Sequence, residues 1–488
     1  MDTSPPPPRL SLSGRILAPL ARIERHEAAA VTAAFCLFFC VMSGYFSIRP
    51  VRDTVGSMMG RERLADLWIV VWVASLAVVP IYGGLVSRFR RSVFLPWTYG
   101  FVAASLVFVG LSLREGAPGA FVGEFVDVLN SVLRVLNSVL NDVYLSLPEV
   151  DPAAFVGQFF WVFTSVLNLF IISVFWSFLL ELFRSDQAKR LFGVIAAGGT
   201  AGALAGPLFT DFTVGMTGNS GVLFIGAGLF CGAIVCQRVL LTLWKRENTA
   251  RAVESGQPDV RDRAIGGNPF AGVSIVARSP YLLAIAMFVV LLATVSTFLY
   301  FEQLRLVEIA YPDPASRTRV FARLDWIVQS LTIVSQVFLT GRIASRLGLV
   351  VLLSMVPVAM VFGFGVLALW NTFPVLAVIF VARRFGEYAF VRPGREMLFS
   401  PLDRETKYKA KNLIDVPVYR GADALAAQIQ VGVGNLGFGP QTIALMGAGT
   451  AILWAIDGWW VGRRHDAAAI ASEASAPMLP APVPARPI

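Results

Sequence analysis

The feature that most constrains this chain is a series of long apolar stretches that recurs through almost the whole sequence. A helix needs about 20 apolar residues to cross a bilayer, because lipid cannot form hydrogen bonds with exposed backbone groups. The sequence therefore predicts an all-α polytopic membrane protein with about twelve transmembrane helices. These predicted helices lie near residues 28–48, 64–86, 95–113, 154–183, 191–212, 221–244, 281–301, 324–345, 349–370, 373–391, 414–437 and 440–461.

The charge content agrees with a membrane protein. Only 15% of the 488 residues are charged, whereas a soluble domain carries about 25%. The net charge of +9 comes from basic residues between the apolar stretches. This distribution is typical of cytoplasmic loops and differs from the basic surface, interleaved with aromatic residues, that binds nucleic acid. We therefore expect the lipid bilayer as a partner and no nucleic acid.

Basic residues also predict the orientation. The loops after the second, fourth, sixth, eighth and tenth predicted helices are rich in Lys and Arg, whereas those after the fifth, ninth and eleventh have almost none. Because cytoplasmic loops carry such an excess, we expect both termini in the cytoplasm and the protein in the inner (cytoplasmic) membrane. The first apolar stretch is too long for a signal peptide and lacks a cleavage site, so we interpret it as an uncleaved helix.

The two halves of the sequence resemble each other. GGLVSRFR at 83–90 ends the second predicted helix, and GRIASRLG at 341–348 ends the eighth. Six helices, a long polar loop and six further helices are the sequence signature of the major-facilitator architecture, and we expect a monomer. The predicted parts are a cytoplasmic N-terminal tail (1–27), a first half (28–244), a cytoplasmic central loop (245–280), a second half (281–463) and a disordered C-terminal tail (464–488).

Two segments have a structural interpretation. Gly198, Gly202 and Gly206 recur every four residues, which predicts a helix face that a neighbouring helix can approach closely. The segment 121–147 contains the letters LNSVL twice and places its polar residues along one stripe. This pattern favours an amphipathic helix on the outer membrane face over a thirteenth span.

The sequence lacks the combinations of residues that form an active site. All four cysteines lie inside apolar stretches without metal-ligand spacing, and the two histidines, His26 and His465, flank the first and last predicted helices. No nucleophile stands beside a base, and no glycine-rich phosphate loop occurs. We therefore expect no enzyme activity, no metal and no cofactor.

Ionisable side chains interrupt the apolar stretches at five places, four of them on the first, fourth, seventh and tenth helices, which line the central cavity of the major-facilitator architecture. A charge at the membrane centre costs about 2.5–3.5 kcal/mol, so such residues persist when they form pairs, reach the surface or line water. Arg49 and Arg52 lie at a helix end, and reaching the surface is an alternative for them. Glu181 and Glu302 are short, and are better candidates for ion pairs or coupling-ion sites. The other charges are Asp53, Arg305, Arg383, Arg384, Glu387, Arg420 and Asp423.

The densest group of charges lies at 392–415, in the letters RPGREMLFSPLDRETKYKAKNLID. One interpretation is a cytoplasmic loop that follows the positive-inside rule. The alternative is that these charges, at the ends of two apolar helices, face a water-filled cavity and bind an anion. Lys407, Lys409 and Lys411 alternate in one short run, whereas the charges of a loop are usually scattered.

These residues give the chain a resemblance to the non-mitochondrial ATP/ADP antiporters of plastids and intracellular bacteria. IRPVRDT at 48–54 is similar to the family's LR-x-x-KDT run, and DQAKRLF at 186–192 is similar to its EEAKRFY. Glu302 and the YP at 311–312 match its seventh helix. The stretch 392–415 aligns without a gap with the family's EM, PLD, K-x-K-x-K and ID series.

The resemblance implies an alternating-access secondary transporter of a small anionic solute, of the ATP/ADP exchange type. The cations would bind the anion, and the glutamates would pair with them in the empty site or take up a coupling proton. The candidate substrate-binding residues are Arg49, Arg52, Glu181, Glu302, Arg395, Lys409 and Lys411.

The sequence departs from the family at three charged positions. Arg52 and Arg392 replace the family's Lys and Asp, and Asp423 stands where a Lys is usual. Such exchanges can change the substrate while the fold is kept. Two alternatives therefore remain open: a transporter of another organic anion, and a membrane binding or scaffold protein of the same fold whose charges neutralise one another.

Overall fold

The structure, a computed structural model, describes residues 27–88, 91–115, 151–183, 185–255 and 271–475, together with Glu24 and scattered positions between 123 and 134. These residues form helices joined by short turns, and no strand occurs among them. The predicted amphipathic segment 121–147, the central loop and the two tails lie wholly or partly outside this part of the chain.

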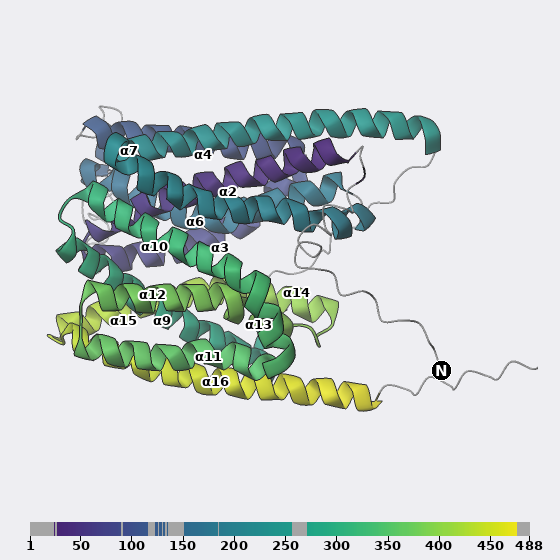
Figure 1. The fold of residues 1–488 in the computed structure, drawn as a ribbon. Helices are drawn as coiled ribbons and strands as arrows, with labels where there is room; N and C mark the ends of the chain where they lie inside the picture. The colour runs from purple at the N-terminus through teal and green to yellow at the C-terminus, as the bar shows by residue number, and fades with distance from the viewer. Residues whose placement is uncertain are drawn as a thin grey trace, which may run out of the picture. The chain divides into compact units, whose positions relative to one another are not determined.

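The chain divides into two compact units. The first contains Met1–Ala264 and Gln303–Ser330, and the second contains Ile265–Glu302 and Leu331–Ile488. The helices of the first unit are α2 (Ala28–Ser57), α3 (Arg61–Arg88), α4 (Arg91–Glu115), α6 (Pro152–Leu182), α7 (Ser185–Ser255), the end of α9 (Pro280–Ala310) and most of α10 (Pro314–Ser335) (Figure 1). The stretch Gln303–Ser330 therefore belongs with the first unit although it lies in the second half of the sequence.

The second unit contains most of α9 and the helices that follow α10. Three of its elements are π-helical turns, which continue the α-helices on either side without a break. Its elements are α8 (Ala271–Arg278), η3 (Gln336–Thr340), α11 (Gly341–Leu369), α12 (Phe373–Gly386), η4 (Glu387–Val391), α13 (Arg392–Leu398), α14 (Arg404–Leu413), η5 (Ile414–Val418), α15 (Tyr419–Asn435) and α16 (Pro440–Ser475).

Two glycines divide long helices. Gly218 in α7 has φ 66° and ψ −177°, and Gly348 in α11 has φ 76° and ψ 176°. This backbone conformation is essentially restricted to glycine, so α7 and α11 each consist of two helices joined end to end. With that division, and with each π-helical turn counted as part of the helix it continues, the described residues contain twelve long helical rods.

Seven described segments are long and apolar enough to cross a membrane. One of them, Arg190–Trp244, has 55 residues and contains the break at Gly218, so it is long enough for two crossings. The predicted number of twelve crossings stays a prediction. The seven segments are Ala28–Ser57, Val93–Arg114, Ala154–Leu182, Arg190–Trp244, Pro280–Ala310, Gly348–Leu369 and Pro440–His465.

In the first unit, α2 packs closely along α7. Cβ atoms added at Gly198, Gly202 and Gly206 of α7 would lie 2.5, 2.5 and 2.6 Å from carbonyl oxygens of α2. Across the same contact, the hydroxyl of Thr210 donates a hydrogen bond to the carbonyl of Ser47, 2.8 Å away. The prediction that this glycine face admits a neighbouring helix is therefore confirmed, and the neighbour is α2.

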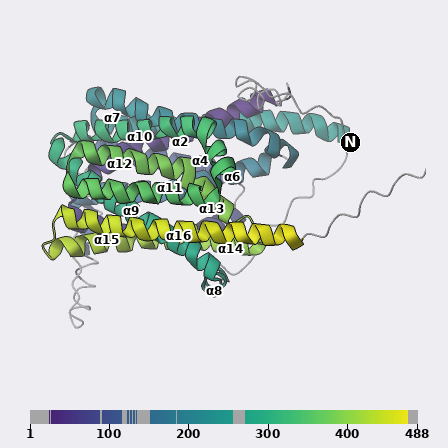
Figure 2. The same ribbon diagram turned by 60° about the horizontal axis from the view of Figure 1, so that its bottom comes forward.

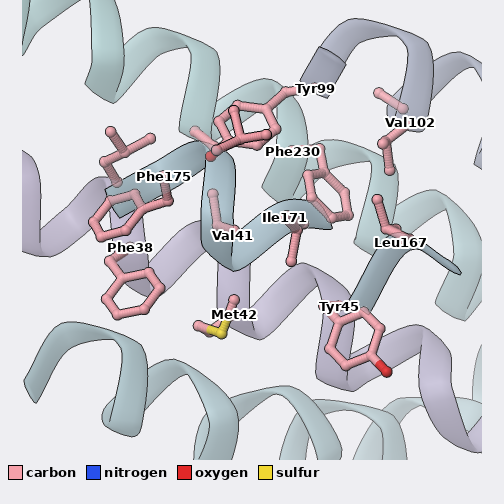
Figure 3. Close-up of a cluster of buried hydrophobic side chains, with 14 of the residues drawn as sticks. Phe38, Val41, Met42, Tyr45, Tyr99, Val102, Leu167, Ile171, Phe175 and Phe230 are labelled. Carbon is pink, nitrogen blue, oxygen red and sulfur yellow. The ribbon is translucent and has the colours of Figure 1, made fainter. Parts of the chain in front are cut away.

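An aromatic core joins α2 to α4, α6 and α7 (Figure 3). Phe38 of α2 stacks on Phe175 of α6, with ring centroids 4.0 Å apart. Tyr99 of α4 and Phe230 of α7 are fully buried beside them, with ring centroids 6.0 Å apart. Aromatic pairs contribute about 0.5–1.5 kcal/mol beyond the burial of their area. This core therefore holds α2 firmly, and α2 carries two of the candidate site residues, Arg49 and Arg52.

In the second unit, α11 and α16 lie side by side in both views (Figures 1 and 2). Small residues again permit the contact, because a Cβ atom at Gly447 of α16 would lie 2.5 Å from the ring of Phe364. The short helix α8 packs against α14, beside which it appears in Figure 2. Helix α8 therefore holds the lysine-rich helix α14 in place.

The stretch 392–415 is mostly helical. Helix continues from α12 through η4 into α13, and from α14 through η5 into α15, so that 399–403 are the residues outside helices. Asp403 begins α14, since its carboxylate accepts a hydrogen bond from the backbone N–H of Thr406 at 2.9 Å. Such a side chain supplies an acceptor to a helix start that has none. Capping therefore extends helix into the charged sequence, and both interpretations of these charges, a cytoplasmic connection and an anion-binding cavity, stay predictions.

Candidate functional site

Two arginines of α2 are partly buried in the first unit. Nη1 of Arg49 lies 3.8 Å from Oδ2 of Asp325 on α10, and the two side chains are 16% and 4% exposed. The guanidinium of Arg52 folds onto the neighbouring Asp53, with Nε 3.0 Å from Oδ1. Both arginines are therefore paired with carboxylates, and the alternative in which they extend to the membrane surface stays a prediction.

Hydroxyl groups continue the contact between α2 and α10. The hydroxyls of Thr54 and Thr318 are 2.6 Å apart and buried, and Nη1 of Arg317 donates to the hydroxyl of Ser57 at 3.1 Å. A buried hydrogen bond of this kind contributes about 0.5–1.5 kcal/mol. Together with the ion pairs, these residues form the α2–α10 polar cluster: Arg49, Arg52, Asp53, Thr54, Ser57, Arg317, Thr318 and Asp325.

A carboxylate of α7 also binds α10. Nε of Arg323 lies 3.1 Å from Oδ1 of Asp211, and the indole N–H of Trp326 donates to Oδ2 of the same residue at 3.3 Å. The start of α10 is therefore held by polar contacts to both α2 and α7. These contacts explain why Gln303–Ser330 belongs with the first unit.

The second unit has its own buried and partly buried charges, on α12, η4 and α15. We call Arg383, Arg384, Glu387, Arg420 and Asp423 the α12–α15 charge cluster. Nη1 of Arg383 lies 3.0 Å from Oε2 of Glu387, one helical turn further along. Nη1 of Arg420 lies 3.4 Å from Oδ2 of Asp423, three residues further along α15. Arg384 packs between aromatic rings, with its guanidinium carbon 5.3 and 5.7 Å from the ring centroids of Phe380 and Tyr388.

Two hydroxyls of α9 complete this cluster. Arg383 donates a hydrogen bond to the hydroxyl of Ser296, and the hydroxyl of Thr297 donates to Oδ1 of Asp423 at 3.0 Å. Charges in an apolar interior persist when they are paired and hydrogen-bonded. Helix α9 thus brings α12 and α15 into one polar site inside the second unit.

The predicted cations of α13 and α14 form a third group in the same unit. Nη2 of Arg395 lies 3.3 Å from Oδ1 of Asp415, and Nζ of Lys411 lies 2.5 Å from Oε2 of Glu396. Lys409 lies on α14 and is half-buried. These pairs link α13 across the short turn to α14 and η5.

The two predicted glutamates lie apart from each other. Glu181 stands one residue before the end of α6, with an exposed side chain. Glu302 of α9 is buried in the second unit, and its Oε1 accepts a hydrogen bond from Nδ2 of Asn371 at 2.6 Å. The described ion pairs of the predicted cations are formed with aspartates and with Glu396. Pairing of Glu181 or Glu302 with those cations stays a prediction.

The polar clusters of both units consist of cations held by carboxylates and hydroxyls. Guanidinium and ammonium groups held in an apolar bundle by carboxylates and hydroxyls can bind oxyanions, whose oxygen atoms match the arginine fork. Among the residues that the structure describes, no three His, Cys, Asp or Glu side chains gather as a metal site.

Comparisons with known proteins show similarity to carrier proteins over most of the chain. The chain is 22% identical over 467 residues to ADP,ATP carrier protein 1 of Chlamydia pneumoniae, and the match covers 86% of this chain and 87% of that one. It is 21% identical over 461 residues to the protein of the same name from Chlamydia muridarum, covering 86% and 84%. The resemblance to the ADP,ATP carriers is confirmed. Because the match extends over most of the chain, it is not confined to one unit. No protein-family model matches the chain.

Solved structures of transporters have the same fold. An auto-inhibited peptide transporter of the POT family superposes with a TM-score of 0.56 at 13% identity, covering 89% of this chain and 97% of that one. A mutant of the nucleoside transporter NupG gives 0.54 at 13% identity, covering 88% and 98%. A bacterial homologue of the iron transporter ferroportin gives 0.53 at 12%, again covering 88% and 98%. The chain is therefore a multi-pass membrane protein, and the predicted major-facilitator-like helical fold is confirmed.

Sequence reasoning missed several polar residues of these clusters. Thr318 and Arg317 escaped because the predicted eighth helix began near 324, whereas α10 begins at Pro314. Asp325 lies inside that predicted helix but was not selected as a site residue. Arg383 and Arg420 were recognised as charges inside apolar stretches but were not selected as site residues. The signal that could have found them is an acid one turn after each arginine, the spacing at which helix side chains meet.

Proposed function

We propose that this chain is a secondary active transporter of the inner membrane that exchanges nucleotides of the ATP/ADP type by alternating access, with both termini in the cytoplasm. One observation carries the proposal. Arg49 and Arg52 are partly buried on α2, in the run that resembles the antiporter motif, and each is paired with a carboxylate. Similarity to ADP,ATP carriers over 86% of the chain supports the same class of substrate.

In this proposal the arginines exchange partners during transport. Arg49 and Arg52 leave Asp325 and Asp53 to bind phosphate oxygens, and the carboxylates neutralise them again when the site is empty. Removal of one member of a buried ion pair costs about 3–5 kcal/mol, so the empty carrier needs these acids. Arg395, Lys409 and Lys411 would bind the anion within the second unit. Glu181 and Glu302 would serve as partners or as sites for a coupling proton.

Uptake of labelled ATP into liposomes tests the proposal directly. We expect the purified protein to take up ATP only when ADP is present inside, and Arg52→Gln to lower this uptake by about tenfold or more, because a hydrogen bond to a charged group contributes about 1.5–3 kcal/mol. Arg114→Gln is the matched control, since Arg114 is an exposed arginine at the end of α4 in the same unit. Equal uptake by the two variants, at equal protein level and thermal stability, would contradict the assignment.

A second candidate is a binding or scaffold protein that keeps the fold without transport. The mutual pairing of Arg420 with Asp423, and of Arg49 with Asp325, favours it, because paired charges can serve only to hold helices together. Such a protein would move no labelled anion into liposomes. A transporter of another organic anion would instead show uptake of that anion, so a thermal-stability screen of organic anions followed by uptake assays separates the two.

A further inference from the structure

We propose that Arg383 and Arg420 of the α12–α15 charge cluster form a phosphate-binding subsite within the second unit. This inference rests on the proposed function in one respect, since the natural ligand would be the phosphate chain of the transported nucleotide. Neither arginine was among the candidate residues predicted from the sequence. The argument starts from hydrogen-bond donors that their present partners leave unused.

Both arginines have a buried donor without an acceptor. Within the described part of the chain, Nε of Arg383 and Nε of Arg420 are buried and donate no hydrogen bond. The two side chains are only 8% and 11% exposed. A buried donor without a partner costs about 1–3 kcal/mol, and native structures rarely retain one without a reason. Two such donors in one polar cluster therefore point to a ligand.

The unused donors result from how each arginine meets its acid. Glu387 and Asp423 follow their arginines on the same helix and contact them through Nη1, at 3.0 and 3.4 Å. A carboxylate that bound the guanidinium through Nε and Nη2 would occupy the planar fork, which is the geometry that phosphate also uses. The intrahelical partners leave Nε of each guanidinium without an acceptor.

The charges in the cluster also favour an anion. Three arginines accompany two carboxylates, so the ionised groups retain a positive charge. The third arginine, Arg384, is held by Tyr388, whose hydroxyl accepts a hydrogen bond from its Nη2 at 3.3 Å. Arg420 has an aromatic neighbour as well, Tyr419, with 5.9 Å between the guanidinium carbon and the ring centroid. Cations beside aromatic rings suit a ligand that combines phosphates with a planar base.

The helices are irregular at this point. The π-helical turn η4 begins at Glu387, and the π-helical turn η5 ends at Val418, two residues before Arg420. Single π-helical turns inside α-helices occur frequently at functional sites, because the extra residue reorients the side chains around it. Their position beside both arginines agrees with a binding site more than with simple helix packing.

Binding of inorganic pyrophosphate to the purified full-length protein in detergent tests the subsite without requiring transport. At constant ionic strength, we expect pyrophosphate and ATP to raise the unfolding temperature, and adenosine to have a smaller effect. Arg383→Gln and Arg420→Gln should each weaken pyrophosphate binding by about 10- to 100-fold, since a hydrogen bond to a charged group contributes that factor. Arg463→Gln, at an exposed arginine of α16 in the same unit, should leave it unchanged.

Glu387→Gln keeps the test decisive if the arginine variants fail to fold. Because this variant lacks the competing carboxylate, it should bind pyrophosphate as tightly as the natural protein or more tightly. If the ion pair is merely structural, the variant should have a lower unfolding temperature, and pyrophosphate should not raise it. The subsite is refuted if pyrophosphate does not bind, or if Arg383→Gln and Arg420→Gln bind it as tightly as Arg463→Gln. Pyrophosphate binding that depends on the two arginines, without ATP exchange in liposomes, would uphold the subsite and overturn the proposed nucleotide exchange. ATP exchange in liposomes together with unchanged pyrophosphate binding in the arginine variants would uphold the proposed nucleotide exchange and overturn the subsite.

Discussion

The contact between α2 and α7 can be tested by adding a single methyl group. A Cβ atom at Gly202 would lie 2.5 Å from the carbonyl oxygen of Phe39, 3.0 Å from the backbone nitrogen of Ser43 and 3.1 Å from Cβ of Met42. Two of these three atoms belong to the backbone of α2, so no side-chain rotation can relieve the clash. In Gly202→Ala the two helices must separate, and α2 must move.

The expected cost follows from these distances. The distance from the added Cβ atom to the carbonyl oxygen of Phe39 has to increase from 2.5 Å to at least the 3.4 Å of an ordinary contact. Overpacking of a tight interior costs about 1–3 kcal/mol. Replacement of a helical glycine by alanine returns about 0.5–1 kcal/mol. We therefore expect Gly202→Ala to lower the free energy of unfolding by about 1–2 kcal/mol. It should also lower ATP uptake, because α2 carries Arg49 and Arg52.

Unfolding of the purified protein in a series of denaturing detergent concentrations measures the free energy. Gly228→Ala is the matched control, since Gly228 lies on α7 with no atom within 4 Å of an added Cβ. The control should be neutral or slightly more stable than the natural protein. If Gly202→Ala proves as stable as Gly228→Ala, the close approach of α2 and α7 is not the tight contact described above.

Three further changes have defined outcomes. The carboxylate of Asp313 accepts a hydrogen bond from the backbone N–H of Ser316 at 2.8 Å, and this bond is the main cause that lowers the pKa of Asp313. Asp313→Ala should cost about 0.5–2 kcal/mol near neutral pH, and the difference in unfolding temperature should vanish as the pH falls through the lowered pKa, where the natural carboxylate also loses its charge. Asn371→Ala should lower the free energy of unfolding by about 1–3 kcal/mol in the detergent titration, because it takes a donor from the buried Glu302. Gly348→Ala should cost about 1–3 kcal/mol in the same titration, because alanine resists a φ of 76°; an unchanged midpoint for any of the three would contradict the contact or conformation concerned.

Most of the fold could be predicted from local properties of the sequence. Apolar stretches of about 20 residues predict helices that cross a membrane, since lipid leaves the backbone no other partner. The spacing of Gly198, Gly202 and Gly206 predicted a close helix contact, because every fourth residue of a helix lies on one face. The charge pattern at 392–415 supported the resemblance to the antiporters, although the conformation of that stretch was predicted less well. Capping by Asp403 and continuation through η4 and η5 extended helices into charged sequence.

The site depended more on tertiary structure. The sequence by itself determined that Arg49, Arg52 and Glu302 lie in apolar surroundings and therefore need partners. It could not determine the partners, because Asp325 lies in another helix of the chain and Asn371 lies between two helices. It also could not show that α10 begins early enough to join α2, or that Arg383 and Asp423 bond to hydroxyls of α9. Burial demands that a charge be paired, and this demand is local; which group satisfies it depends on distances between helices, which only the packed structure decides.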